Sequence, residues 1–285
     1  MSTLLKVTKR GFIRLAGKGL LLSLMHPSLS MAQSYETIQA QLNQIDEELL
    51  EAGLFFRERQ DIELEYYRAR PWAKRPKPSR RAISPAAIDL IVKFEVSSRA
   101  RYQAKFRRPI WPRGNSGVTF GIGYDAGYAK PKWLQDDWTG IIPQADIEHL
   151  QTACQQRGRD AQRILRNYRN IDIDWSDAYS QFHSRTLPLY VAETLAALPG
   201  ANSLSDDSLG ALVSLVYNRG ASFNKRGNRY REMRRIRGHL IRGTVDQIPD
   251  ELRSMTRIWR HNRDLRGVVL RREIEADLFE IGLRS

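Results

Sequence analysis

Glu95 is the residue of this sequence best suited to donate a proton. Three apolar residues ahead of it recur at the spacing of one helical face: Ile88, Ile91 and Val92. The same helical register turns Glu95 toward that apolar side. Because burial disfavours the charged form of a carboxyl group, such a position favours the protonated acid that general acid catalysis needs.

A structural role for Glu95 fits the same spacing. In that interpretation Glu95 lies at a helix end and its carboxylate pairs with one of three nearby arginines: Arg99, Arg101 and Arg107. The position of Glu95 alone leaves both interpretations open.

The glycine-rich segment 117–127 carries a hydroxyl and a carboxylate, those of Thr119 and Asp125. Its apolar residues alternate along the chain: Val118, Phe120 and Ile122. This alternation predicts a short β-hairpin rather than a helix. Thr119 and Asp125 are six positions apart, an even separation that places both side chains on one face of the hairpin if no bulge intervenes. A dinucleotide-binding loop is excluded, because the third glycine is misplaced and no strand-to-helix context follows.

Glu95 and this segment together resemble the active site of the lysozyme-like superfamily. The common phage-type lysozymes carry their residues in the order Glu, Asp, Thr, yet no acidic residue lies between Glu95 and Thr119 here. The order Glu, Thr, Asp is similar to that of the pesticin-type branch of muramidase toxins and related cell-wall hydrolases. Two runs carry this similarity: Ser116-Gly117-Val118-Thr119 and Gly123-Tyr124-Asp125.

Two downstream runs extend the resemblance to roughly residues 84–285. The run 212–220, which reads Leu-Val-Ser-Leu-Val-Tyr-Asn-Arg-Gly, is similar to the central helix of these enzymes and its exit. Gly220 would stop that helix. The run 259–279, which contains the pair Arg271-Arg272, is similar to the C-terminal part of these enzymes.

The resemblance implies a peptidoglycan hydrolase that cleaves the β-1,4 bond between N-acetylmuramic acid and N-acetylglucosamine. Such a reaction needs an acid for the leaving oxygen and a group that activates water on the opposite side of the sugar. Glu95 would be the acid, Asp125 the base, and the Thr119 hydroxyl would hold the water, which predicts inversion at the anomeric carbon. Three further acids stand as spare candidates that nothing places near Glu95: Asp136, Asp137 and Glu148.

The residues expected to bind the sugar chain flank these motifs. They are Tyr102, Tyr124, Tyr217, Asn218 and Arg219. We expect no cofactor, and no metal, because the five histidines show no paired ligand spacing and the single cysteine, Cys154, cannot form a zinc cluster.

The elements that must position these residues are mostly helices. Helical patterns recur over five segments downstream of the hairpin: 144–168, 175–198, 206–217, 230–241 and 263–281. Ahead of Glu95, Ser84 and Pro85 suit the cap and first residue of a helix. The sequence therefore predicts a mainly helical α+β fold, a lysozyme-like catalytic domain over residues 84–285 with one small hairpin at its active site.

Two segments precede this domain. Residues 33–70 form an acidic arm whose apolar stripe predicts a helix that packs on the catalytic domain: Ile38, Leu42, Ile45 and Leu49. Residues 71–83 are basic and proline-rich, which predicts an extended linker and a domain boundary near residue 82.

The first 32 residues have the layout of a signal peptide. They contain five Lys or Arg and no acid, followed by a short apolar run and Ser30-Met31-Ala32. The run 8–14, Thr-Lys-Arg-Gly-Phe-Ile-Arg, resembles a twin-arginine export motif with Lys in place of the first Arg. An amphipathic N-terminal helix is the alternative. Export predicts a periplasmic or secreted protein, and the apolar run is too short for a transmembrane span.

The charge of the chain predicts an anionic partner. Its formal net charge is +14, and the densest basic run lies at 225–237. Peptidoglycan fits this charge together with the export signal, and a toxin of this kind would have an immunity or inhibitor protein as a further partner. A nucleic-acid surface is less favoured, because no reader motif accompanies the basic run. The rival hypothesis is a non-catalytic wall-binding or nucleic-acid-binding protein that keeps a lysozyme-like fold.

Overall fold

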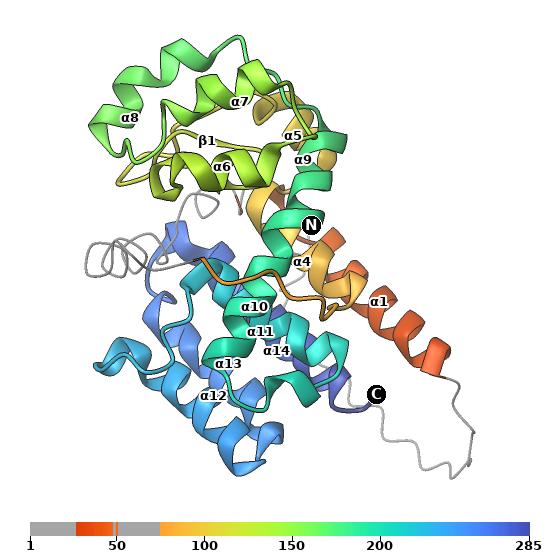
Figure 1. Cartoon of the computed structure of the whole chain (residues 1–285). Coiled ribbons are helices and arrows are strands. Elements are labelled where there is room, and N and C mark those ends of the chain that lie inside the picture. The colour runs from red at the N-terminus through yellow and green to blue at the C-terminus, as the bar shows by residue number, and fades with distance from the viewer. Residues whose placement is uncertain (1–26, 48–49, 51–74) are drawn as a thin grey trace, which may run out of the picture.

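The computed structural model describes residues 27–47, 50 and 75–285 and is mainly helical (Figure 1). A two-stranded antiparallel sheet, β1 (Thr119–Phe120) and β2 (Tyr124–Asp125), lies among helices, as the sequence predicts. The α-helices are α1 (Pro27–Asn43), α4 (Pro85–Val96), α5 (Arg99–Lys105), α6 (Pro131–Trp138), α7 (Gln144–Gln151), α8 (Arg159–Ile164), α9 (Trp175–Gln181), α10 (Leu187–Ala197), α11 (Asp206–Arg219), α12 (Arg231–Arg242), α13 (Ile248–Ser254) and α14 (Arg266–Gly282).

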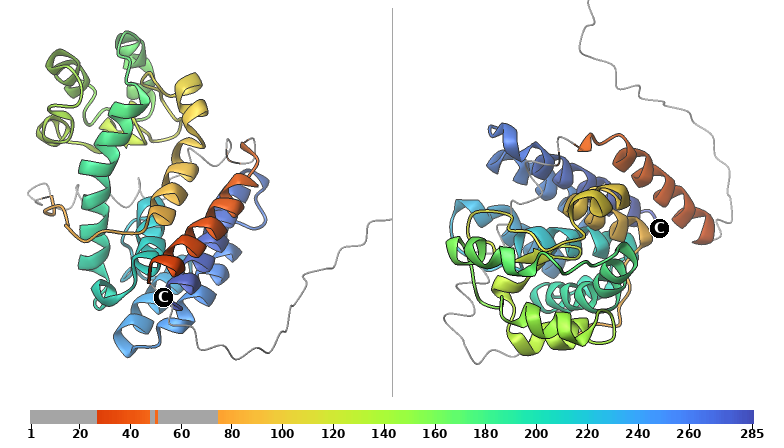
Figure 2. Two further views of the ribbon diagram at one scale, coloured as in Figure 1. Left: turned by 90° about the vertical axis from the view of Figure 1, so that its right-hand side faces the viewer. Right: turned by 90° about the horizontal axis from the view of Figure 1, so that it is seen from above.

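The elements form two groups (Figure 1). One contains the hairpin with α5 to α9, and the other contains α10 to α14 with α1 beside them. A π-helical turn, Phe182–Thr186, joins α9 to α10, so that they make one long run between the groups (Figure 2). Helix α4 also extends from one group toward the other.

Helix α11 is the centre of the core. It packs against α4, α10 and α14, and nearly all of its residues are buried. Its Gly210 allows this packing, because a Cβ there would lie 2.2 Å from the Cβ of Ala87 on α4. Gly220 follows the last residue of α11 with φ +74°, the helix stop that the sequence predicts.

Helix α4 begins as its sequence predicts. Ser84 is the N-cap, its side chain accepts a hydrogen bond from the amide of Ala87, and Pro85 is the first helical residue. The helix ends at Val96, where Ser97 takes a φ of 70°. Glu95 therefore lies in the last turn of α4.

The arm helix α1 packs on the rest of the molecule. Ile38, Leu42 and Ile45 are buried, whereas Leu49 lies outside the described residues. Helix α1 lies against α4 and α14, and two glutamine side chains fix its direction. They donate to carboxylates on those helices, Gln39 to Asp89 and Gln41 to Asp277.

Other N-terminal expectations fall partly outside the described residues. Most of the expected signal peptide and residues 51–74 of the expected arm and linker are not described. Helix α1 begins at Pro27, so the expected cleavage point at Ala32 lies inside a helix. Over the described ranges no helix is both long and apolar enough to cross a membrane.

Residues 75–83 are extended, and they are bonded to the helical domain rather than separate from it. The Ser79 amide donates to the Pro188 carbonyl at 2.9 Å, and Arg81 donates to the Asp206 carboxylate. The boundary predicted near residue 82 therefore does not mark the start of the domain's contacts.

Replacing Ile38 by Ala tests the packing of α1. Ile38 is fully buried, so its truncation is expected to lower the free energy of unfolding by about 2–4 kcal/mol. Glu36→Ala, at an exposed position of the same helix, is the control and should change stability by less than about 0.5 kcal/mol. Chemical denaturation measures both, and equal small effects would mean that α1 does not pack on the domain in solution.

Candidate active site

Glu95 is buried near the end of α4 and is paired with an arginine from the other end of the chain. Arg271 Nη1 donates to Glu95 Oε1 at 3.0 Å, and both side chains are at most 3% exposed. The residue is thus buried, as its helical spacing predicts, and also ion-paired. The burial fits the first interpretation drawn from the sequence and the ion pair fits the second, whereas the role of Glu95 as an acid stays a prediction.

The arginines proposed as partners for Glu95 were the wrong ones. The chain turns at Ser97, and Arg99 and Arg101 begin a separate helix, α5, capped by Ser98. Arg107 pairs with Asp172 on the surface, where Nε and Oδ1 are 2.7 Å apart. Closeness in the sequence did not predict the partner of Glu95, because the helix break at Ser97 removes these residues from the helical register of Glu95.

Arg271 connects α14 to both α4 and α11. Its Nε donates to Ser214 Oγ at 3.1 Å and to Glu275 Oε1 at 3.3 Å, and its Nη2 donates to the Ser214 carbonyl at 3.1 Å. Arg272 Nη2 donates to the same Glu275 oxygen at 2.7 Å. We call Glu95, Arg271, Glu275 and Arg272 the buried charge network. Each guanidinium in it donates to a carboxylate, which limits the free-energy cost of burying four charges.

The two arginines of the buried charge network share their donors with Glu275. Burial dominates at Arg272, whose pKa it lowers to about 10 although Glu275 opposes the shift. Arg271 divides its donors between Glu95, Ser214 and Glu275, so its charge is not devoted to Glu95 alone.

The hairpin brings Thr119 and Asp125 together. They are directly opposite each other in the β1–β2 register, so their side chains leave the same face of the sheet. The connecting turn takes positive φ at Gly121 and Gly123, +59° and +75°. No bulge interrupts the described register, so the even spacing predicted the shared face correctly.

Backbone amides hold the Asp125 carboxylate in place. The amides of Gly117 and Gly127 each donate to Asp125 Oδ1 at 2.9 Å. A Cβ on Gly117 would lie 2.3 Å from the Gly127 amide nitrogen, so only glycine allows this approach. Two amide donors stabilise an ionised carboxylate. Thr119 lies beside this anchor, and its Oγ1 donates to the Gly117 carbonyl at 3.3 Å.

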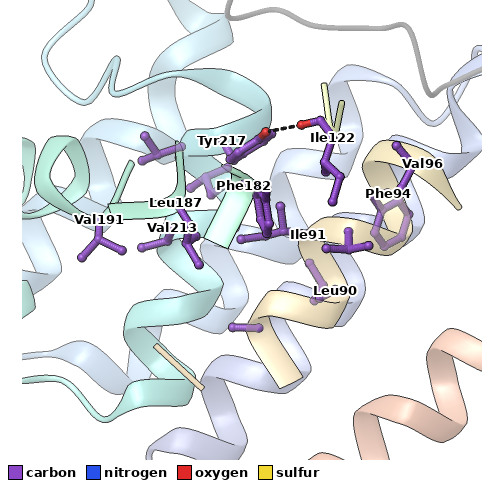
Figure 3. Packing of buried hydrophobic residues seen from close by; sticks show 14 of the residues in the cluster. Leu90, Ile91, Phe94, Val96, Ile122, Phe182, Leu187, Val191, Val213 and Tyr217 are labelled. Carbon is purple, nitrogen blue, oxygen red and sulfur yellow. Dashed lines mark hydrogen bonds between the residues drawn. The ribbon is translucent and has the colours of Figure 1, made fainter. Parts of the chain in front are cut away.

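The hairpin tip and the buried charge network meet on α11. Tyr217 donates its hydroxyl hydrogen to the carbonyl of Ile122, in the hairpin turn, at 3.0 Å (Figure 3). Ser214, which Arg271 holds, is three residues earlier on α11, about 4.5 Å along the helix axis. Glu95 and the hairpin are therefore positioned by the same turn of one helix.

The three tyrosines predicted to bind sugar lie inside the protein. Tyr102 is fully buried and donates to the Ile173 carbonyl, Tyr217 donates to the hairpin turn, and Tyr124 donates to Asp137 Oδ2 at 2.9 Å. Burial raises the pKa of Tyr124 well above its ordinary value, so its hydroxyl remains a neutral donor. These hydroxyls join elements of the fold, and aromatic type and motif position did not reveal that the three side chains are buried.

Asn218 and Arg219 are also buried. The Arg219 guanidinium lies over the rings of Trp259 and Tyr230, at 5.2 and 5.4 Å from their centroids, and donates to the Arg229 carbonyl. Burial lowers the pKa of Arg219 to about 10. In this structure Arg219 holds the loop after α11.

The sequence did not predict the burial or the bonding partners of Asp137. It is buried behind the hairpin, where it accepts hydrogen bonds from Tyr124 and from Arg75. Asp136, its neighbour, is exposed and pairs with Lys132, and Glu148 accepts a bond from Gln144 on the surface. No cluster of His, Cys, Asp and Glu that could hold a metal ion occurs in the described part of the chain.

Comparison with known proteins adds no relative. A scan against protein-family models finds none that matches this chain, and a search of curated proteins finds no match either. The function therefore has to be inferred from the chain's own motifs and side-chain geometry.

Replacing Arg271 by Met tests the buried charge network. The variant keeps much of the side-chain volume but removes the bonds from Arg271 to Glu95 and Glu275, so the free energy of unfolding should fall by about 3–5 kcal/mol. Arg107→Met is the matched control, because its pair with Asp172 is exposed and should contribute little to stability. Urea denaturation of both variants measures the difference, and equal losses would contradict the role of Arg271.

Proposed function

We propose that this chain is a muramidase, a glycoside hydrolase that cleaves the β-1,4 bond between N-acetylmuramic acid and N-acetylglucosamine in peptidoglycan. The observation that carries the proposal is that α11 contacts both the hairpin, through Tyr217 and Ile122, and the partner of Glu95, through Ser214 and Arg271. The resemblance of the motif order to pesticin-type muramidases supports the same reaction.

Glu95 has the surroundings that suit a general acid. Its side chain is buried, and the proposed role requires that its carboxyl carries a proton before the reaction. In the reaction Glu95 gives its proton to the glycosidic oxygen as the bond from that oxygen to the anomeric carbon breaks. The carboxylate that remains is then stabilised by Arg271, 3.0 Å away.

Asp125 and Thr119 have the surroundings that suit the water-activating pair. The Gly117 and Gly127 amides favour an ionised Asp125, which accepts a proton as the water oxygen forms its bond to the anomeric carbon. The Thr119 hydroxyl donates to the Gly117 carbonyl, so its oxygen is left to accept a hydrogen from that water. One proton leaves Glu95 and one arrives at Asp125, which balances the step.

The basic loop 221–230 supports an anionic polymer as substrate. Arginines from three directions donate to its carbonyl oxygens: Arg234 to Lys225 and Gly227, Arg257 to Asn228, and Arg219 to Arg229. These carbonyl oxygens are thus hydrogen-bonded within the protein. Arg226 and Arg229, in the same loop, are exposed to solvent. Such a surface attracts a polyanion, and the peptide carboxylates of peptidoglycan provide one.

The proposal also has consequences for location. Peptidoglycan lies outside the cytoplasmic membrane, so the chain has to be exported to the periplasm or the medium. The expected signal in residues 1–32 would provide this route.

Replacing Glu95 by Gln tests the acid. The amide preserves the shape of the side chain and cannot donate the proton, so the release of reducing sugar from purified cell wall should fall by about 10²–10⁴-fold. Glu36→Gln, on the exposed face of α1, is the control and should keep full turnover. Binding of the wall without any release by the folded wild-type protein would favour the non-catalytic wall-binding rival.

The stereochemistry of the product tests the water-holding pair. If Asp125 and Thr119 activate a water opposite Glu95, proton NMR of the first-formed sugar should show inverted anomeric configuration. Asp125→Asn, which can still accept the Gly117 and Gly127 amides, should lower turnover by about 10²–10⁴-fold. Thr119→Ser keeps the hydroxyl and should lower turnover less than Thr119→Val. A retained product would remove the role given to Thr119.

A further inference from the structure

Residues 75–83 cross the domain and bond to it at three places. We call this segment the strap. It bonds to α6 through Arg75 and Asp137, to the first turn of α10 through Ser79 and Pro188, and to the start of α11 through Arg81 and Asp206. Figure 1 shows it as the extended orange segment that runs across α10 to the start of α4. The strap thus touches both groups of elements.

The contact between Arg75 and Asp137 is the most consequential of the three. Arg75 Nη1 lies 2.6 Å from Asp137 Oδ1, and the Asp137 side chain is only 5% exposed. The guanidinium also lies over the ring of Trp133, 5.4 Å from its centroid. Burial alone would lower the pKa of Arg75, but the hydrogen bond and charge of Asp137 outweigh it and raise the pKa, so Arg75 stays charged.

Asp137 in turn holds the hairpin. Its Oδ2 accepts the Tyr124 hydroxyl at 2.9 Å, and Tyr124 is the residue before Asp125 in β2. The rings of Phe120, Tyr124 and Trp138 pack together with centroids 5.2–5.7 Å apart. One side chain therefore joins the strap to the strand that carries Asp125.

We propose that Arg75 is a positioning residue for the active-site hairpin. By neutralising the buried Asp137, it lets that carboxylate hold Tyr124, and through Tyr124 the strand on which Asp125 opposes Thr119. The basic segment ahead of the lysozyme-like region is then part of the catalytic unit. The catalytic consequence rests on the proposed muramidase function, whereas the effect on the hairpin does not.

The effect on the hairpin is tested in the full chain by amide hydrogen exchange. In Arg75→Ala, Asp137 is left buried without its cation, so the Gly117 and Gly127 amides that donate to Asp125 should exchange faster by about tenfold or more. Arg81→Ala is the matched control, since it removes a strap contact at Asp206 and leaves Asp137 paired. Exchange at these glycines that rises equally in both variants, or in neither, would overturn the proposal.

A second substitution separates positioning from a general loss of stability. Asn at position 137 needs no cation and still accepts the Tyr124 hydroxyl, so Asp137→Asn combined with Arg75→Ala should return the two glycine amides to near wild-type exchange. Arg75→Lys keeps the charge but loses the planar donor pair. Its glycine amides should exchange at rates between those of the wild type and of Arg75→Ala. A double variant that exchanges as fast as Arg75→Ala would contradict the chain of contacts.

Turnover on purified wall supplies the catalytic readout. Arg75→Ala should lower kcat by about tenfold with KM little changed, because the hairpin groups act in the transition state, and Arg81→Ala should change neither. Normal kcat in Arg75→Ala with fast hairpin exchange would overturn the catalytic part of the proposal. If the wild-type protein releases no sugar, the muramidase function fails, and the exchange measurements still decide the role of Arg75.

Discussion

The cost of burying charge governs the centre of this protein. Glu95, Arg271, Glu275 and Arg272 are almost entirely removed from water. An isolated charge in such a place would be very unfavourable, so each must find its partner within a narrow range of geometry. Arg271 reaches Glu95 on α4 and Ser214 on α11 from its position on α14, so the requirement fixes three helices relative to one another.

The hairpin takes its position from that same assembly. Tyr217 on α11 donates to the carbonyl of Ile122, three residues beyond the serine that Arg271 binds. A second bond joins the hairpin to α6, where Tyr124 donates to Asp137. Arg75 in turn donates to Asp137 and supplies its counter-charge. A short two-stranded sheet has little stability of its own, so contacts outside its ladder, such as these two hydroxyl bonds, are needed to hold it.

Local signals in the sequence predicted the secondary-structure elements but did not predict the bonding partners of the buried side chains. The cap at Ser84, the helix stop at Gly220 and the shared face of Thr119 and Asp125 each depend on a few neighbouring residues, and each was predicted correctly. The partner of Glu95 lies 176 residues away along the chain. No periodicity encodes such a contact, because it arises only when α4 and α14 pack. The burial of the tyrosines was not predicted for the same reason, because a hydroxyl that bonds to a distant carbonyl has no local signature in the sequence.

Stability alone does not account for the buried charge network. Apolar residues of similar volume in place of a buried ion pair often leave a protein as stable or more so, so four buried charges are a poor choice for holding three helices together. A carboxyl that must release a proton has a different requirement, because it needs low polarity around the neutral form and a fixed cation for the ion that remains. Glu95 is buried and has that cation, and Glu275, which Arg272 also binds, keeps Arg271 oriented toward it. The arrangement is costly for a core, and this cost is the physical argument for the acid role that we propose for Glu95.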